Sequence, residues 1–259
     1  MILAFDVGNT ETTVALFDGE SIAAHWRITT SLPRTPDEFS MLIRSLLHSD
    51  SIEVQSVTGS AICSVVPPVT EILGAACHDI VGSDPVFVDA RANLPIRLEV
   101  DEPLTVGADR VANTLAASRI WKRDAIVVDL GTATTYDCIT ADGAFIGGII
   151  QPGVRTSAET LFRRTSQLAA TELIPPKKII GTRTDECIRS GVLYGAADSI
   201  DGLVGRIKKE WKTDAIVLAT GGLAQQLEEF CCSFDEVDPY LTLKGVRMGF
   251  DLIKAASTA

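Results

Sequence analysis

Two short segments of this chain place a carboxylate, a glycine and polar groups directly after an apolar strand. Residues 6–10 (DVGNT) follow the apolar residues 2–5, and residues 129–132 (DLGT) follow residues 125–128. A glycine in such a turn lets backbone N–H groups approach a ligand closely, and nearby polar groups can bind phosphate oxygens. One copy could be an ordinary turn. The second copy favours a duplicated phosphate-binding unit, with the two turns facing each other across a cleft around a nucleotide triphosphate.

Residues 107–110 (GADR) carry a more specific chemistry. An aspartate next to an arginine offers a general base and an anchor for an anion, which suits a substrate with a hydroxyl and a carboxylate. The alternative is that Asp109 caps a helix and Arg110 forms a surface ion pair. Residues 219–224 (ATGGLA) likewise fit either a base or ribose lying against the backbone or a tight strand-to-helix turn.

Two other phosphate-binding patterns are absent from the sequence. There is no GxxxxGK[ST] segment of a P-loop and no GxGxxG segment after a strand. Neither turn contains a lysine, so phosphate charge must be neutralised by Mg²⁺ and by backbone dipoles. Asp6 is the candidate partner of the metal ion or of its water ligands.

The hairpins that carry these turns recur along the chain. Asp-Gly pairs that begin at Asp18 and at Asp142 predict a hairpin turn in each half. Asp6 and Asp129 are 123 positions apart, and the two Asp-Gly pairs are 124 positions apart. The two units therefore keep their register within one residue, which indicates a duplication.

Helical spacing of apolar residues predicts the main helices. It indicates helices over residues 37–48, 109–121 and 185–211, the last with an apolar stripe that suits either a core or a dimer interface. With strands between them, the chain reads as an α/β fold of two βββαβα halves. We expect an N-terminal half, residues 1–117, and a C-terminal half, residues 118–259.

Composition limits the classes of function. The chain has 259 residues, of which 46% are hydrophobic and 22% are charged, and no apolar run is long enough for a membrane span. The six cysteines form no CxxC pair, and no signal peptide is evident, so we expect reduced thiols and a cytoplasmic protein. A net charge of −11 disfavours nucleic acid and anionic membranes as partners.

Taken together, the motifs DVGNT, GADR, VDLGTATTYD, GGIIQPG and ATGGLA resemble, in order and spacing, those of type III pantothenate kinases. The resemblance runs from residue 2 to about residue 250 and includes residues 25–27 (HWR), 64–68 (SVVPP) and 238–245 (DPYLTLKG). It implies the duplicated, ribonuclease H-like fold of the acetate and sugar kinase, Hsp70 and actin superfamily. It also implies transfer of the γ-phosphoryl group of ATP to the primary hydroxyl of pantothenate, which gives 4′-phosphopantothenate for coenzyme A biosynthesis.

The resemblance further implies the roles of individual residues. Asp109 is the general base, and Asp129 is the ligand of a monovalent cation, K⁺ or NH₄⁺, needed beside Mg²⁺. Thr132 contributes to the second phosphate turn. The first phosphate turn comprises Asp6, Val7, Gly8, Asn9, Thr10, Glu11, Thr12 and Thr13. The pantothenate-binding set comprises Gly107, Ala108, Asp109, Arg110 and Thr184.

The resemblance also implies a homodimer in which the second protomer helps to enclose pantothenate. Two positions depart from the family pattern, because Val100 replaces a frequent tyrosine and Glu11 replaces a frequent asparagine. Two alternatives stay open at this point: a non-enzymatic accessory protein related to this family, and another phosphotransferase of the superfamily such as a sugar kinase or an exopolyphosphatase. The retained Asp109 and Arg110 favour the pantothenate kinase.

Overall fold

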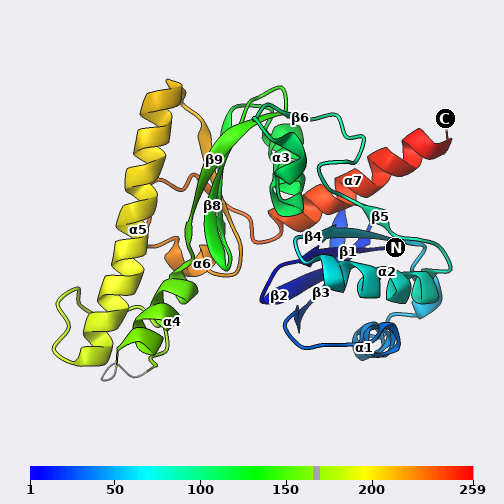
Figure 1. Ribbon diagram of the computed structural model, residues 1–259, viewed down its shortest axis with the longest axis horizontal. Helices are drawn as coiled ribbons and strands as arrows, with labels where there is room; N and C mark the ends of the chain where they lie inside the picture. The colour runs from blue at the N-terminus through cyan, green and yellow to red at the C-terminus, as the bar shows by residue number, and fades with distance from the viewer. Residues whose placement is uncertain (166–169, 259) are drawn as a thin grey trace. The chain divides into compact units, whose positions relative to one another are not determined.

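The computed structural model, drawn in Figure 1, describes residues 1–165 and 170–258. Its elements are β1 (Ile2–Val7), β2 (Glu11–Asp18), β3 (Ser21–Thr29), α1 (Pro36–Ser49), η1 (Val54–Ser56), β4 (Gly59–Ser64), α2 (Pro67–Val81), β5 (Val86–Phe87), β6 (Arg97–Leu98), η2 (Pro103–Thr105), α3 (Ala108–Trp121), β7 (Ala125–Leu130), β8 (Ala133–Ile139), β9 (Ala144–Pro152), α4 (Val154–Arg164), α5 (Thr184–Trp211), β10 (Ile216–Thr220), α6 (Ala224–Leu227), β11 (Glu236–Val237) and α7 (Leu241–Thr258). The predicted α/β class is confirmed.

The chain folds into two compact units. Unit 1 comprises Met1–Ile120, Asp142–Phe145 and Leu241–Ala259, and unit 2 comprises Trp121–Ala141 and Ile146–Tyr240. This division differs from the expected boundary after residue 117. The C-terminal helix α7 belongs to unit 1 because it packs against β1 and β4 rather than against its sequence neighbours.

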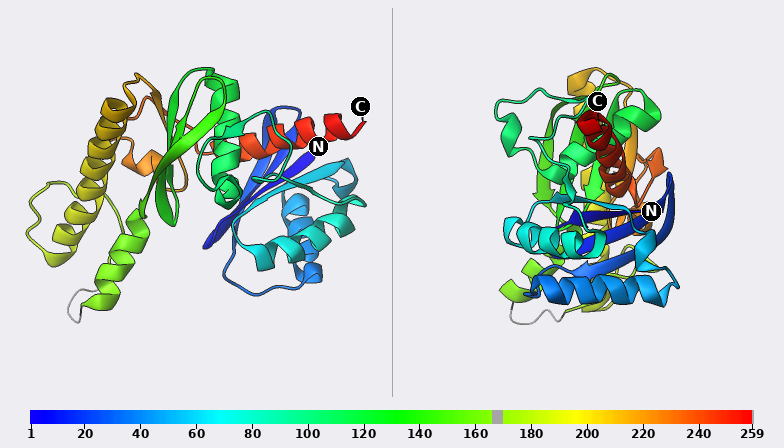
Figure 2. Two further views of the ribbon diagram at one scale, coloured as in Figure 1. Left: turned by 45° about the horizontal axis from the view of Figure 1, so that its top comes forward. Right: turned by 90° about the vertical axis from the view of Figure 1, so that its right-hand side faces the viewer.

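Unit 1 is built on a five-stranded sheet with the order β3-β2-β1-β4-β5. Strand β1 runs antiparallel to β2 and parallel to β4. Helices α1 and α2 cover one face of the sheet, where Ile43 and Leu73 share a core with Leu3 and Phe5. Helix α7 packs on the other face (Figures 1 and 2). Because both faces are covered, β1 is apolar along almost its whole length, and its one polar residue is Asp6, next to its last residue Val7.

Helix α1 shows how local sequence sets an element boundary. Thr35 is the N-cap, and its hydroxyl accepts from the Glu38 N–H at 3.3 Å while the Glu38 carboxylate accepts from the Thr35 N–H at 2.7 Å. Pro36 at the first helical position has no N–H that would need a partner. The helix predicted over residues 37–48 is therefore confirmed, with one extra residue at each end.

Unit 2 holds most of a six-stranded sheet with the order β11-β10-β7-β8-β9-β6, in which β6 and the start of β9 belong to unit 1. The 28-residue helix α5 packs along this sheet. Much of the apolar stripe of α5 is core, because Leu193, Ala197, Ile200 and Val204 are buried with Ile126, Val128 and Ala219. The predicted helix over residues 185–211 is confirmed.

Local sequence also sets boundaries after α1. Residues 54–64 contain η1 and β4, and α2 begins at Pro67. Pro67 and Pro68 start this helix because proline is tolerated in a first helical turn. Among the described helices, none has both the length and the apolar character that crossing a bilayer requires.

Candidate active site

The first turn joins β1 to β2 and contains the predicted phosphate-binding residues 6–13. Asp6 lies opposite Thr13 in the strand pair, and the Gly8 N–H donates to the Glu11 carbonyl at 3.1 Å. A Cβ atom at Gly8 would lie 3.0 Å from that same carbonyl oxygen. Residues 9–10 are exposed at the tip, and Asp6 is half-buried at the strand end. The turn therefore presents one carboxylate and a polar tip to solvent.

Two of the predicted residues in this turn are engaged within unit 1. Thr12 is buried, and its hydroxyl lies 2.8 Å from the hydroxyl of Thr30. The side chain of Thr12 therefore holds the hairpin in place and does not face a ligand. Glu11 lies 3.6 Å from Arg27 of β3, so part of the extra negative charge at position 11 is balanced by a neighbour that sequence reasoning did not pair with it.

The second turn, between β7 and β8, is one residue shorter than the first. Here the Gly131 N–H donates to the Ala133 carbonyl at 3.1 Å, two positions onward instead of three. Gly131 and Thr132 form its exposed tip. The two turns are therefore related but not equivalent.

The second turn is fastened to the start of α4. The Thr132 carbonyl accepts from the Gly153 N–H at 3.1 Å and from the Thr156 hydroxyl at 2.7 Å. A Cβ atom at Gly153 would lie 2.4 Å from the same carbonyl oxygen, so only glycine permits this approach. Gly153, the last glycine of the GGIIQPG segment, thus shapes the second turn, a role that sequence spacing alone did not reveal.

Asp129 lies at the end of β7 beside the glycine turn that follows β10. Gly221 has φ +90°, and a Cβ atom there would lie 2.5 Å from Asp129 Oδ1. Gly221 is therefore required by its backbone conformation and by its closeness to the carboxylate. Gly222 is exposed, and a Cβ atom there would meet nothing within 4 Å. The open side of Gly222 is the part of this turn that a ligand could approach.

Asp109 lies in the first turn of α3, which begins at Ala108, so the expected N-cap role of Asp109 is wrong. Its Oδ1 accepts from the Arg110 N–H at 2.8 Å. Burial raises the pKa of the Asp109 carboxyl above its ordinary value of 3.8, although the hydrogen bond and charge of Arg110 oppose that shift. A Cβ atom at Gly107 would lie 2.4 Å from Asp109 Oδ1. Glycine at position 107 therefore makes room for the carboxylate.

Val65, in the SVVPP segment, connects the first turn with the GADR segment. Its N–H donates to the Val7 carbonyl at 3.1 Å, and its Cγ1 lies 3.7 Å from the position that a Cβ atom at Gly107 would occupy. All three residues belong to unit 1. Unit 1 therefore brings the first turn and the GADR segment into the same region.

Arg110 is held on both its backbone and its side chain. The Thr114 hydroxyl donates to the Arg110 carbonyl at 2.7 Å, and the guanidinium carbon lies 4.8 Å from the centroid of the Phe145 ring. Phe145 is buried and also belongs to unit 1. Sequence reasoning missed Phe145, because nothing in its local pattern relates it to a residue 35 positions earlier in the chain.

Thr184 is the first residue of α5 and lies in unit 2, where it lines a cavity of about 660 Å³. The wall consists of β8, β9, α4 and α5. Gln151 is fixed inside it, because its amide group donates to the Tyr136 hydroxyl at 2.9 Å and accepts from Ser199 at 3.1 Å. Burial raises the pKa of Tyr136, which stays protonated at neutral pH. The cavity is lined mostly by apolar side chains, with a few polar groups that could orient a bound molecule.

Metal binding by protein groups alone has no support in the described part of the chain, where no cluster of three or more His, Cys, Asp or Glu side chains could hold an ion. A single carboxylate at each turn fits a different arrangement. Mg²⁺ commonly keeps several waters and is bound through substrate phosphates and one or two carboxylates. Asp6, half-buried at its strand end, fits that requirement.

Comparison with known proteins identifies relatives over almost the whole chain. The sequence model described as type III pantothenate kinase matches residues 2–206. The type III pantothenate kinase of Roseiflexus castenholzii is 42% identical over 252 residues, which cover 97% of this chain and 99% of the relative.

Solved structures show the fold. The activator of the 2-hydroxyisocaproyl-CoA dehydratase from Clostridium difficile has a TM-score of 0.57 at 12% identity, covering 99% of this chain and 97% of its own. The ROK hexokinase from Thermus thermophilus has a TM-score of 0.53 at 10% identity, covering 100% of this chain and 99% of its own. The predicted fold of the acetate and sugar kinase, Hsp70 and actin superfamily is confirmed.

Proposed function

The chain belongs to the type III pantothenate kinase family, and from this premise we propose which of its residues carry out the phosphorylation of pantothenate by ATP, the first step of coenzyme A biosynthesis. The observation that carries the proposal is the environment of Asp109. A partly buried carboxylate whose pKa is raised by desolvation lies next to a cation, and a glycine leaves room for its Oδ1.

Asp109 acts as the general base for the primary hydroxyl of pantothenate. Phosphoryl transfer needs an aligned nucleophile and dispersed negative charge more than a strong base. A carboxylate with a raised pKa is better matched to accept the hydroxyl proton as the new P–O bond forms. Arg110 holds the carboxylate of pantothenate, because a guanidinium group can donate two parallel hydrogen bonds to a carboxylate. Gly107 and Ala108 complete this substrate-binding segment.

The two turns bind the phosphates of ATP. Residues 7–13 of the first turn offer backbone N–H groups and the side chains of Asn9 and Thr10, while Asp6 orients Mg²⁺ or its water ligands. Mg²⁺ neutralises charge on the phosphate oxygens when it is bound. Thr132 contributes its hydroxyl in the second unit, where the bonds from Gly153 and Thr156 fix its backbone.

Asp129 is the proposed ligand of a monovalent cation, K⁺ or NH₄⁺. Its carboxylate lies beside Gly221, where the backbone approaches closely enough that no other residue fits. This arrangement supports a site made of one carboxylate and nearby carbonyl oxygens, which is the ligand type that hard cations prefer. The open side of Gly222, in the same turn, supports an adenosine contact.

We propose a homodimer, which would enclose pantothenate with help from Thr184. Several large apolar side chains of unit 2 are exposed, namely Ile150, Leu161, Ile174, Ile179 and Ile180. Exposed apolar side chains that form a contiguous patch mark protein interfaces. All six cysteines are free thiols, which supports a reducing compartment such as the cytoplasm.

ADP release, measured with ATP, Mg²⁺ and K⁺, tests this function. We expect turnover with pantothenate and none above background with glucose or acetate. Replacement of K⁺ by Na⁺ should lower the rate, and indifference to that exchange would remove the cation role of Asp129. Equal turnover with glucose would favour a sugar kinase instead, and absence of turnover with all three substrates would favour a non-enzymatic relative.

A further inference from the structure

The side chain of Arg110 is stacked on an aromatic ring that comes from a distant part of the sequence. Its guanidinium carbon lies 4.8 Å from the ring centroid of Phe145, which is only 1% exposed. Both residues belong to unit 1. A guanidinium group over a desolvated aromatic face is attracted by the ring quadrupole.

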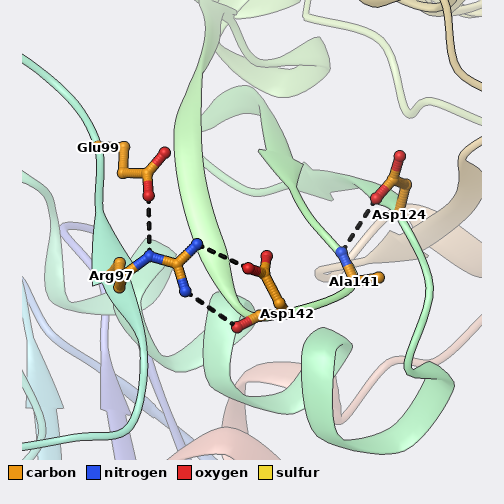
Figure 3. A network of polar contacts seen from close by, with 5 residues as sticks. All are labelled: Arg97, Glu99, Asp124, Ala141 and Asp142. Atoms are coloured by element: carbon orange, nitrogen blue, oxygen red, sulfur yellow. Dashed lines mark hydrogen bonds and ion pairs between the residues drawn. The ribbon is translucent and has the colours of Figure 1, made fainter.

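Phe145 is held in place by the pairing of β6 with the start of β9. The Arg97 N–H donates to the Gly143 carbonyl at 2.9 Å, and the Glu99 N–H donates to the Phe145 carbonyl at 2.8 Å. The Arg97 guanidinium group bonds Asp142 Oδ2 at 2.9 Å and Glu99 Oε1 at 2.8 Å (Figure 3). These contacts attach residues 142–145 to unit 1, and with them the ring under Arg110.

Helix α3 approaches the same segment along one face. Arg110, Thr114 and Ser118 are spaced four residues apart, and each hydroxyl donates to the carbonyl one turn earlier, at 2.7 and 2.8 Å. A Cβ atom at Gly143, which has φ +84°, would lie 3.5 Å from Ser118 Oγ. The face of α3 that carries Arg110 therefore lies along residues 143–145, so both partners of the stack have fixed backbones.

We propose that Phe145 is a positioning residue for recognition of the pantothenate carboxylate, acting through Arg110. This inference rests on the proposed role of Arg110 in the preceding section. An arginine side chain has many rotamers, and ordering it when the substrate binds costs affinity. The stack on Phe145 restricts those rotamers before binding, so the paired N–H donors meet a planar carboxylate at lower entropic cost.

The test compares Phe145→Leu with two substrates. Leucine keeps an apolar side chain but removes the aromatic face. We expect the KM for pantothenate to rise about 3- to 30-fold, with kcat changed less than about twofold. For pantothenyl alcohol, in which a hydroxymethyl group replaces the carboxylate, the same variant should change KM less than about twofold. An equal change for both substrates would show a merely structural role and overturn the proposal.

Two controls separate stacking from packing. Phe39→Leu removes a second buried ring in unit 1, which lies 5.3 Å from the guanidinium carbon of Arg34 and outside the proposed site; it should leave both KM values unchanged. Fluorinated phenylalanines at position 145 keep the ring volume but weaken its quadrupole. The KM for pantothenate should rise with the number of fluorine atoms, and a flat series would overturn the proposal even if Phe145→Leu fails to fold.

Arg110→Ala distinguishes failure of this inference from failure of the site assignment. If this variant raises KM for pantothenate and not for the alcohol, Arg110 holds the carboxylate, and the Phe145 variants alone decide the inference. If Arg110→Ala changes the KM values for pantothenate and for the alcohol by the same factor, the proposed role of Arg110 is wrong and the inference fails with it. Absence of wild-type turnover with pantothenate would instead contradict the proposed function itself.

Discussion

Two features of the Asp109 environment shift the pKa of its carboxyl group in opposite directions. Burial raises its pKa, while the neighbouring Arg110 N–H and cation stabilise the ionised form. A carboxyl group whose pKa is higher in the folded than in the unfolded state binds its proton more tightly when folded. Its ionisation therefore removes stability as pH rises from the unfolded value through the folded value.

Asp109→Asn should therefore be more stable than the wild type above the raised pKa, since the amide keeps an oxygen acceptor for the Arg110 N–H. The difference in melting temperature should be smallest near pH 3.8, the ordinary pKa of the carboxyl, and should grow as pH rises to the raised pKa of the folded state, above which it stays constant. Thermal unfolding of both proteins, monitored by circular dichroism, measures it. A less stable variant at every pH would show that the site favours the ionised carboxylate overall.

Gly107 offers a second test at the scale of a single residue. Gly107→Ala places a Cβ atom 2.4 Å from Asp109 Oδ1 unless the carboxylate moves. A displacement of about 1 Å at a catalytic group can cost about a hundredfold in rate, so we expect kcat to fall by about that factor. ATP binding measured by calorimetry should be unchanged. Unchanged kcat would show that Asp109 does not need its present position.

The sequence identified these residues as candidates but did not identify the residues around them. Asp6, Asp109 and Arg110 were identifiable because their motifs combine residue type with a fixed position next to a strand or helix. The contacts of Arg27 with Glu11 and of Phe145 with Arg110 could not be identified from the sequence. Each of them joins residues on separate elements. Side-chain pairing of this kind depends on register and packing, which no local pattern reports.

At the scale of elements, the duplicated hairpins have diverged in a way that suits different ligands. Residues 8–10 join the strands of the first hairpin, whereas only Gly131 and Thr132 join those of the second, and the Thr132 carbonyl accepts hydrogen bonds from the start of α4. Asp-x-Gly spacing predicted both turns but not this difference, because the length of a turn follows from strand register. We expect the first turn to bind the Mg²⁺-triphosphate and Asp129 to bind the monovalent cation.

The two adjacent glycines after β10 provide a matched pair of variants. Gly221→Ala should destabilise the protein by about 1–3 kcal/mol, because φ is +90° and a Cβ atom would lie close to Asp129 and Leu130. Gly222→Ala should fold normally, because its Cβ atom meets no protein atom, but should weaken ATP binding. Denaturant unfolding and nucleotide titration measure the two effects. Full ATP affinity in Gly222→Ala would remove this turn from the proposed adenosine site.

For the whole molecule, the sequence predicted the class of fold but not how the chain divides. Helix α7 illustrates the difference, because apolar periodicity cannot say which sheet a helix covers. Its Val246 and Phe250 are buried in unit 1, and a Cβ atom at Gly59 of β4 would collide with the Phe250 ring. The apolar stripe of α5 was equally ambiguous, and the structure assigns much of it to the core of unit 2.

Because part of α5 is core, the proposed homodimer should depend on the exposed isoleucines that precede it. Ile179 and Ile180 are 64% and 81% exposed. The double variant Ile179→Asp, Ile180→Asp should shift the protein from dimer to monomer in sedimentation velocity, because charge at the centre of an apolar interface is costly. Met41→Asp, at an exposed apolar residue of unit 1, is the control and should stay dimeric. If the double variant is still a dimer, the surface around Ile179 and Ile180 is not the dimer interface.

The central claim is that Asp109 accepts the proton of the pantothenate hydroxyl, and turnover of Asp109→Asn tests it most directly. The variant should bind ATP with wild-type affinity, while formation of 4′-phosphopantothenate, followed by mass spectrometry, should fall by about 10²- to 10⁴-fold. Near-normal product formation in a variant that still binds ATP would contradict the account.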